Sequence, residues 1–143
     1  MRRVGSIILF VAGGWMLCSQ VLMAFFDMGG GVAPAAFAIT VFLLLAAPFL
    51  LLGAWASPGV RWRELGLTML IAAGVGGVSA LTMILMFADP TVKDILPPDV
   101  KQPDFALLPG FINLAVVAVL GFVQYRLGRR TLEASTSHSR RWL

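Results

Sequence analysis

Four runs of apolar residues, each long enough to cross a lipid bilayer as a helix, constrain this chain more than any other feature. A hydrocarbon layer of roughly 30 Å takes about 20 helical residues to cross. Runs of that length occupy residues 4–26, 35–56, 65–88 and 107–126. Bilayer lipid offers peptide groups no water to bond, and the runs lack the alternation of barrel strands, so they are predicted to be helices.

Turn-forming residues separate the four runs, and the segments between the runs are too short for a soluble domain. The predicted fold is therefore all-α, a single integral membrane four-helix bundle over residues 1–143. A loop over 89–106 and a basic tail over 127–143 are its longest segments outside the membrane. Pro48 lies within the second run, where it removes a backbone hydrogen bond and is predicted to kink the helix.

Basic residues predict the orientation, because they resist translocation across a membrane. Nine of the eleven Lys and Arg residues lie before the first run, between the second and third, or at the end of the fourth and after it. The opposite side carries Lys93 and Lys101 against five aspartates. Both termini are therefore expected in the cytoplasm, with the protein in a bacterial-type inner (plasma) membrane.

Reactive side chains are scarce, which argues against an enzyme. Cys18 is the only cysteine, and the only histidine, His138, stands in the polar tail, so no metal-ligand set or cofactor site is expected. No charged residue lies clearly inside an apolar run, although proton-driven transporters usually keep one there. The tail lacks a platform for nucleic acid, and its arginines are expected to fix the topology and to face anionic lipid headgroups.

Four uncharged polar residues are predicted to lie at one depth in the membrane. Gln20, Thr40, Thr82 and Asn113 each stand five or six residues from an expected outer helix end, about 8 to 9 Å deep at 1.5 Å per residue. One interpretation is interhelical glue, in which Gln20 and Asn113 pair because an amide alone in lipid is penalised. The other is a polar binding pocket that opens to the outer side.

Small residues spaced four apart predict close packing between helices. The third run carries Ala72, Gly76 and Ala80 along one face, and the first run carries a weaker version in Gly14 and Cys18. The partner of the third helix is expected to be another helix of the same chain. A second copy of the chain, or a different membrane protein, stays open as an alternative.

Trp15 falls in the middle of the first run, whereas the other tryptophans cluster toward the basic side, where such rings prefer the headgroup level. One interpretation is that the Trp15 ring fills space between helices. The other is that it lines a cavity for a lipid, a quinone or another apolar ligand.

The loop over 89–106 is longer than a connector needs to be, which favours a function for it. Asp89 before Pro90 has the form of a helix N-cap and its first residue, and an apolar face is expected after them, lying on the bilayer or on a partner. Four aspartates recur at every fifth residue but lack the compact spacing of a calcium loop, so they are expected to be solvated.

Together these features favour an accessory or scaffold subunit that packs against a larger membrane assembly, or against itself, and does not catalyse a reaction. The alternative is a small homo-oligomeric carrier or channel for an uncharged or lipophilic solute, which would use the polar residues and the kink at Pro48. Interfacial lipid chemistry usually needs a nucleophile with a base, or a metal, and the sequence supplies neither at one depth.

Overall fold

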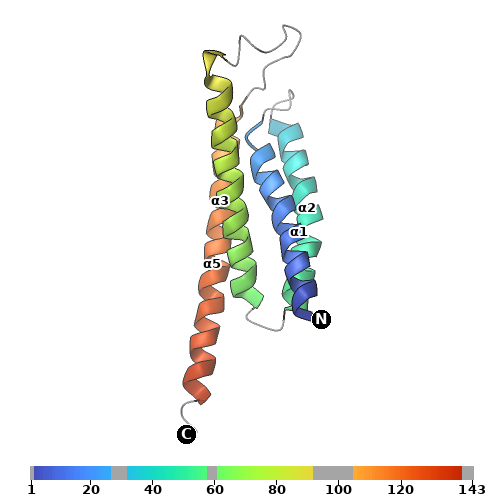
Figure 1. Ribbon diagram of the computed structural model, residues 1–143, viewed down its shortest axis with the longest axis vertical. Helices are drawn as coiled ribbons and strands as arrows, with labels where there is room; N and C mark the ends of the chain where they lie inside the picture. Colours follow the sequence, from blue (N-terminus) through green and yellow to red (C-terminus); the bar gives the residue numbers. More distant parts are fainter. Residues whose placement is uncertain (1, 27–31, 58–60, 92–104, 140–143) are drawn as a thin grey trace.

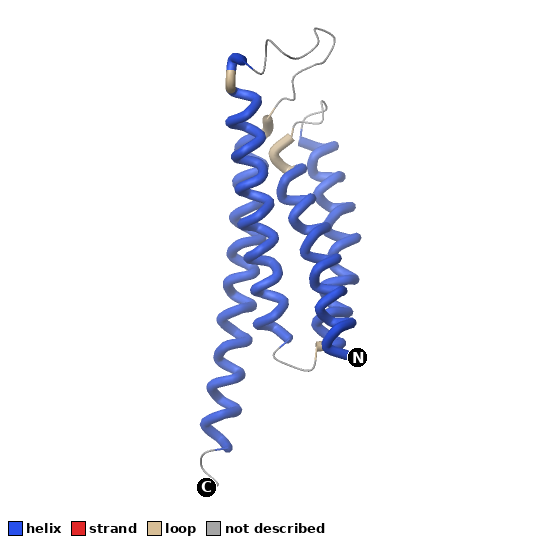
Figure 2. Tube along the Cα trace, in the orientation of Figure 1, coloured by secondary structure: helices blue, strands red, loops and turns tan. Residues whose placement is uncertain are grey.

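The computed structural model describes residues 2–26, 32–57, 61–91 and 105–139, with side-chain environments for all of these except 2, 32–39, 42, 61 and 132–139. The described residues form four helices, α1 (Arg2–Met23), α2 (Val32–Ala56), α3 (Arg61–Ala88) and α5 (Leu107–Ser139) (Figures 1 and 2). The prediction of an all-α fold is confirmed.

Three of the helices are long and apolar enough to cross a membrane, over Arg3–Met23, Trp62–Ala88 and Leu107–Thr131. In α2, the residues with described side chains from 43 onward form a further apolar stretch, Leu43–Ala56. Large apolar side chains stand exposed along the outer faces of all four helices. Soluble monomers rarely expose apolar surface on this scale, so the chain has the character of a membrane protein.

The first helix ends at Met23, three residues before the predicted end at Phe26. The amides of Phe25 and Phe26 bond to carbonyls only three residues back, both at 3.1 Å, which tightens the chain into a turn. The carbonyl of Phe25 then accepts a hydrogen bond of 2.8 Å from the Ala106 amide, and Phe26 pairs with Phe105 in an isolated bridge. The last apolar residues of the run therefore hold the start of α5 instead of extending α1.

The fourth helix continues to Ser139, well beyond the predicted end at Arg126. Gly128 does not end it, because this glycine serves a contact between helices: a methyl group placed there would lie 2.7 Å from the Cα atom of Arg63. The residues that follow include arginine, leucine, glutamate and alanine, which all favour a helix. Figure 1 shows the resulting lower part of α5 projecting past the ends of the other helices.

The helices form two antiparallel pairs that lie side by side, α1 with α2 and α3 with α5 (Figure 1). Contact between α1 and α3 joins the two pairs. Within the described part of the chain, α2 and α5 do not touch each other, so the four helices are not closed into a ring. The predicted bundle is therefore an open one. Its two middle helices, α1 and α3, lie along each other, and their line of contact is called the seam below.

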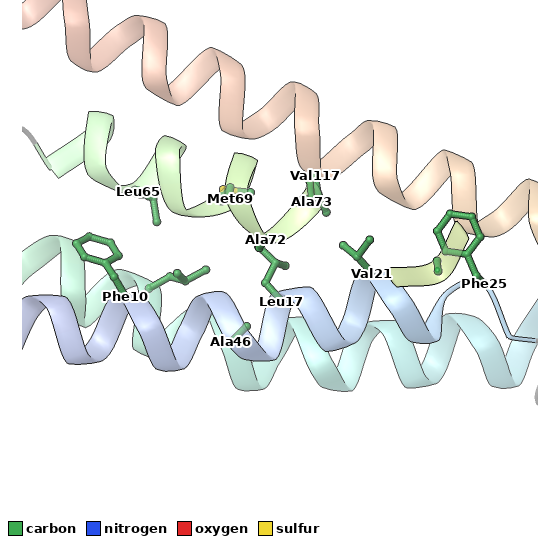
Figure 3. Close-up of a cluster of buried hydrophobic side chains, with 12 residues drawn as sticks. Phe10, Leu17, Val21, Phe25, Ala46, Leu65, Met69, Ala72, Ala73 and Val117 are labelled. Atoms are coloured by element: carbon green, nitrogen blue, oxygen red, sulfur yellow. The ribbon is translucent and has the colours of Figure 1, made fainter. Parts of the chain in front are cut away.

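Buried side chains line this seam on the side that α2 and α5 cover (Figure 3). Leu17 and Val21 point from α1 toward α3 and are at most 1% exposed. Ala72 and Ala73 of α3 are nearly as buried, and Val117 of α5 closes the cluster from the far side. Because the buried residues of α3 are mostly small, the two middle helices can approach closely.

An aromatic cluster ties three helices together at the end of the molecule where α1 and α3 finish and α5 begins. The Phe25 ring, which is 2% exposed, packs edge to face on Phe111 of α5 with centroids 5.2 Å apart. Phe105 stands 5.4 Å from Phe26 and 6.1 Å from Phe87 of α3. Such aromatic pairs contribute beyond the area that they bury, so this cluster fixes where the chain enters α5.

Candidate functional site

A groove of about 780 Å³ runs along the seam between α1 and α3. Its floor includes Phe10 and two small residues, Gly14 of α1 and Ala72 of α3. Its rims are exposed apolar side chains: Ile7, Val11 and Trp15 of α1, and Leu67, Ile71 and Val75 of α3. The volume falls within the range of small-molecule sites, about 300–1,000 Å³, and such sites are mostly apolar with a few polar groups.

The polar groups of this groove gather at one end. Glu64, near the start of α3, accepts a hydrogen bond from the hydroxyl of Ser57, which is 4% exposed. Ser6, also buried, donates to the carbonyl oxygen of Gly53 at 3.0 Å and so fixes α1 against α2. Arg3 completes this end of the groove from the first turn of α1. The site therefore combines one cation and one anion with a long apolar channel.

Trp15 lines the groove and does not fill space between helices. Its side chain is 74% exposed, the largest exposed fraction among the large apolar residues of the described chain. The first interpretation of this residue is therefore wrong. The reason is rotational: Leu17 turns to the buried side of α1, and Trp15, two residues earlier and about 200° away around the helix, turns outward.

Two of the four polar residues predicted at one depth meet in the structure. The Gln20 side-chain nitrogen donates a hydrogen bond of 2.9 Å to the side-chain oxygen of Asn113, which links α1 to α5. Gln20 is fully buried. The other oxygen and nitrogen of the pair, Gln20 Oε1 and Asn113 Nδ2, are buried and have no hydrogen-bond partner among the described residues. The contact joins two helices that otherwise touch little.

The two threonines do not stand beside this amide pair as partners. Thr82 is exposed, and its hydroxyl donates to the Val78 carbonyl of its own helix at 2.9 Å. Thr40 is also exposed. Counting residues along a helix gives depth but not direction, so side chains at a common depth can point to different faces.

Replacing Asn113 with leucine is expected to destabilise the protein by about 1 kcal/mol, because Gln20 would be left buried without its partner. Replacing Gln20 with leucine should cost a similar amount. The double variant should cost less than the sum of the two, since it leaves no unpaired amide. Unfolding free energies in detergent micelles measure all three values, and strictly additive costs would show that the pair contributes nothing as a pair.

The stripe of small residues lies at the contact between α1 and α3. A methyl group on Gly76 would stand 2.9 Å from both the Cys18 carbonyl oxygen and the Val21 side chain. Ala72 and Ala80 are buried on the same side of α3. The helix packed on this stripe thus belongs to the same chain.

A second close contact, between α3 and α5, escapes sequence reasoning. A methyl group on Gly66 would overlap the backbone of Tyr125 and lie 2.5 Å from the Gly121 carbonyl oxygen. Gly121 and Gly128 are seven residues apart, which places them on one face of α5 two turns from each other. That spacing is one signal in the sequence, and the other is on α3, where Gly66, Ala73 and Gly77 lie seven and four residues apart on one face.

The loop after α3 begins as predicted, with Asp89 as a helix cap. Its carboxylate accepts hydrogen bonds from the Thr91 hydroxyl at 2.7 Å and from the Thr91 amide at 2.9 Å, at the start of a helical turn. Both bonds lower the pKa of Asp89 below its ordinary value, and the bond from the Thr91 hydroxyl has the larger effect. The other aspartates of the loop, and its expected apolar face, lie outside the described residues.

The cap at Asp89 is expected to weaken in acid. The pKa of Asp89 is lower in the folded chain than its ordinary value of about 4. The cap therefore stabilises the fold fully above that ordinary value, and its contribution is lost as the pH falls through the lowered pKa. The protection of the Thr91 amide against hydrogen exchange, taken relative to the intrinsic exchange rate at the same pH, should therefore fall in that acid range. An Asp89→Asn variant, which keeps an acceptor but does not titrate, should remove this pH dependence, and an unchanged profile would show that the cap does not control the turn.

Within the described ranges, no three histidine, cysteine, aspartate or glutamate side chains come together in a way that could hold a metal ion. His138 and the last turns of α5 fall among the residues whose side chains are not described. Comparison with known proteins yields no match to any family model, to any curated protein or to any solved structure.

Proposed function

We propose that the chain is a multi-pass protein of a bacterial-type inner (plasma) membrane, with both termini in the cytoplasm. The described ends of the chain lie at the same end of the molecule (Figure 1). The segments expected at that end carry nine of the eleven basic residues. Trp55 and Trp62, both more than half exposed, flank the connection between α2 and α3 there, as aromatic belts do. We include a kink at Pro48 in this proposal, because no hydrogen bond from its nitrogen is possible.

In this membrane the protein acts as an accessory or scaffold subunit, which binds another membrane protein, or a second copy of itself, and does not catalyse a reaction. The length of α5 is the observation that supports this role. Eleven residues of α5, 129–139, follow the contact of Gly128 with Arg63 at the start of α3. At 1.5 Å per residue they extend about 16 Å farther.

This part of α5 continues a helix that is already formed, but it ends in serine, threonine and histidine residues of modest helix propensity, and tertiary packing supplies most of the stability of helices in proteins. The projecting part of α5 is therefore suited to lie against a second surface. Its first turn exposes Arg129 and Arg130, and Arg126 just before them stacks over the Phe122 ring at 5.2 Å. Basic side chains here would face anionic headgroups or an acidic surface on a partner.

The role is tested by extracting the protein gently from its native membrane and identifying its stoichiometric partners by native gel and mass spectrometry. Two truncations provide a matched comparison, one ending at Arg130 and one ending at Ser139. The first removes the projecting helix but keeps the Gly128 contact, and the second keeps the whole of α5.

We expect a defined larger complex with the full chain and with the longer truncation, and its loss with the shorter one. Circular dichroism on both truncations controls for the transmembrane helices. If both truncations migrate with the same partners as the full chain, α5 is not the contact element. If the full chain is monomeric in its native membrane, the accessory role is wrong.

A further inference from the structure

The groove between α1 and α3 carries two opposite charges at one end. Arg3 makes no hydrogen bond or ion pair with any residue that the structure describes, and Glu64 is held only by the Ser57 hydroxyl. A purely anionic headgroup would meet the carboxylate there, and a purely cationic one would meet the guanidinium. A headgroup with both charges complements both side chains.

The length of the groove matches one leaflet of a bilayer. From Arg3 to Cys18 it follows α1 for about 22 Å, at 1.5 Å per residue. Half of a hydrocarbon core is about 15 Å, and the headgroup region adds about 5–7 Å. An amphiphile with its headgroup at Arg3 would therefore reach the bilayer midplane near Trp15 and Cys18.

We propose that this groove binds one aminophospholipid of the phosphatidylethanolamine type. Its phosphate lies at the Arg3 guanidinium, its primary ammonium donates to the Glu64 carboxylate, and one acyl chain runs between Val11 and Ile71 toward Trp15. A primary ammonium has three N–H donors, as lysine has, whereas a choline headgroup has none. The Ser57 hydrogen bond holds the carboxylate ready for this contact.

The walls of the groove suit an acyl chain better than a polar ligand. The rim side chains Ile7, Val11, Leu67 and Ile71 are between 46% and 66% exposed, so they are not packed by the protein itself. The small residues Gly14 and Ala72 below them leave the channel open. Since the surrounding lipid is equally apolar, the walls give little preference by themselves, and selectivity must come from the charged end.

The test uses the full-length protein in nanodiscs made from equal parts phosphatidylethanolamine and phosphatidylglycerol, with native mass spectrometry after release. We expect one phosphatidylethanolamine to be retained per chain. Glu64→Gln and Arg3→Gln should each lower its retention about tenfold, as expected for the loss of one charge-assisted hydrogen bond. Val11→Trp should abolish retention by filling the channel.

Two of the variants, Arg3→Gln and Val11→Trp, have matched controls outside the groove. Arg63→Gln makes the same charge change as Arg3→Gln at a side chain that lies over the Tyr125 ring of α5, and Val119→Trp adds the same ring as Val11→Trp at a position of α5 that is 61% exposed. Both controls should retain the lipid as the unchanged chain does. Helical content and the unfolding midpoint verify that every variant is folded.

Three results would overturn the proposal. The first is equal retention of phosphatidylethanolamine by Glu64→Gln and by the unchanged chain. The second is retention of phosphatidylglycerol as strong as that of phosphatidylethanolamine. The third is a dimer that Val11→Trp dissociates, with no lipid displaced, because a second copy would then occupy the groove.

Discussion

Replacing Gly66 with leucine is expected to separate α3 from α5 and to lower the free energy of unfolding by about 3 kcal/mol, the upper part of the range for overpacked cores. A side chain at this position would meet backbone atoms of Tyr125 and Gly121, which cannot move aside without moving the helix. The change is measured by denaturant titration in detergent micelles, followed by circular dichroism.

The matched control is Gly74→Leu on the same helix. Gly74 is exposed, and a methyl group there would meet no atom within 4 Å. This variant should unfold within about 0.5 kcal/mol of the unchanged chain, as most surface substitutions do. If the two glycine variants lose the same stability, the close approach of α3 and α5 does not hold the pair together.

Replacing Phe25 with alanine is expected to destabilise the protein by about 2 kcal/mol. The estimate takes about 24 cal/mol for each Å³ of cavity and a phenyl ring of roughly 100 Å³. Only the cavity contributes, since in a membrane the unfolded helices also keep their side chains out of water. The ring fits against Gly110, where a methyl group would lie 2.5 Å from the Phe25 Cγ atom.

Phe122→Ala serves as the control for Phe25, because it removes the same ring from a side chain that is 50% exposed. Its loss should cost no more than about 0.5 kcal/mol in the same unfolding measurement. The prediction would be contradicted by equal losses from the two variants, which would mean that the aromatic cluster does not anchor the entry to α5.

Length and apolarity predict where the helices lie, because both follow from crossing a layer of fixed thickness. The start of α5 at Leu107 and the ends of α2 and α3 match the expected positions. The end of α5 does not match, because the thickness of a membrane sets no limit on the length of a helix outside the lipid. The turn at Phe25 and Phe26 depends on a hydrogen bond to Ala106, a residue far away in the sequence.

Except for α3, whose stripe of small residues marks the face packed on α1, the rotation of the helices about their own axes could not be predicted from the sequence. A water-soluble helix has one apolar face that indicates which side is buried, but helices apolar on all sides lack this signal. Thr82 illustrates the result: it lies six residues after Gly76, about 240° around α3 from the face that meets α1. The groove beside Trp15 depends on the same rotations, so it becomes visible only when α1 and α3 are packed.

The proposed orientation, in which the helices cross the membrane and both chain ends lie in the cytoplasm, can be tested by labelling single cysteines. In a Cys18→Ala background, Asp99→Cys probes the loop before α5 and Ser139→Cys probes the end of α5. An impermeant maleimide applied to intact cells should label the first variant, and should label the second only after the membrane is broken. Labelling of Ser139→Cys in intact cells, together with protection of Asp99→Cys, would show that the orientation is the reverse of the one proposed.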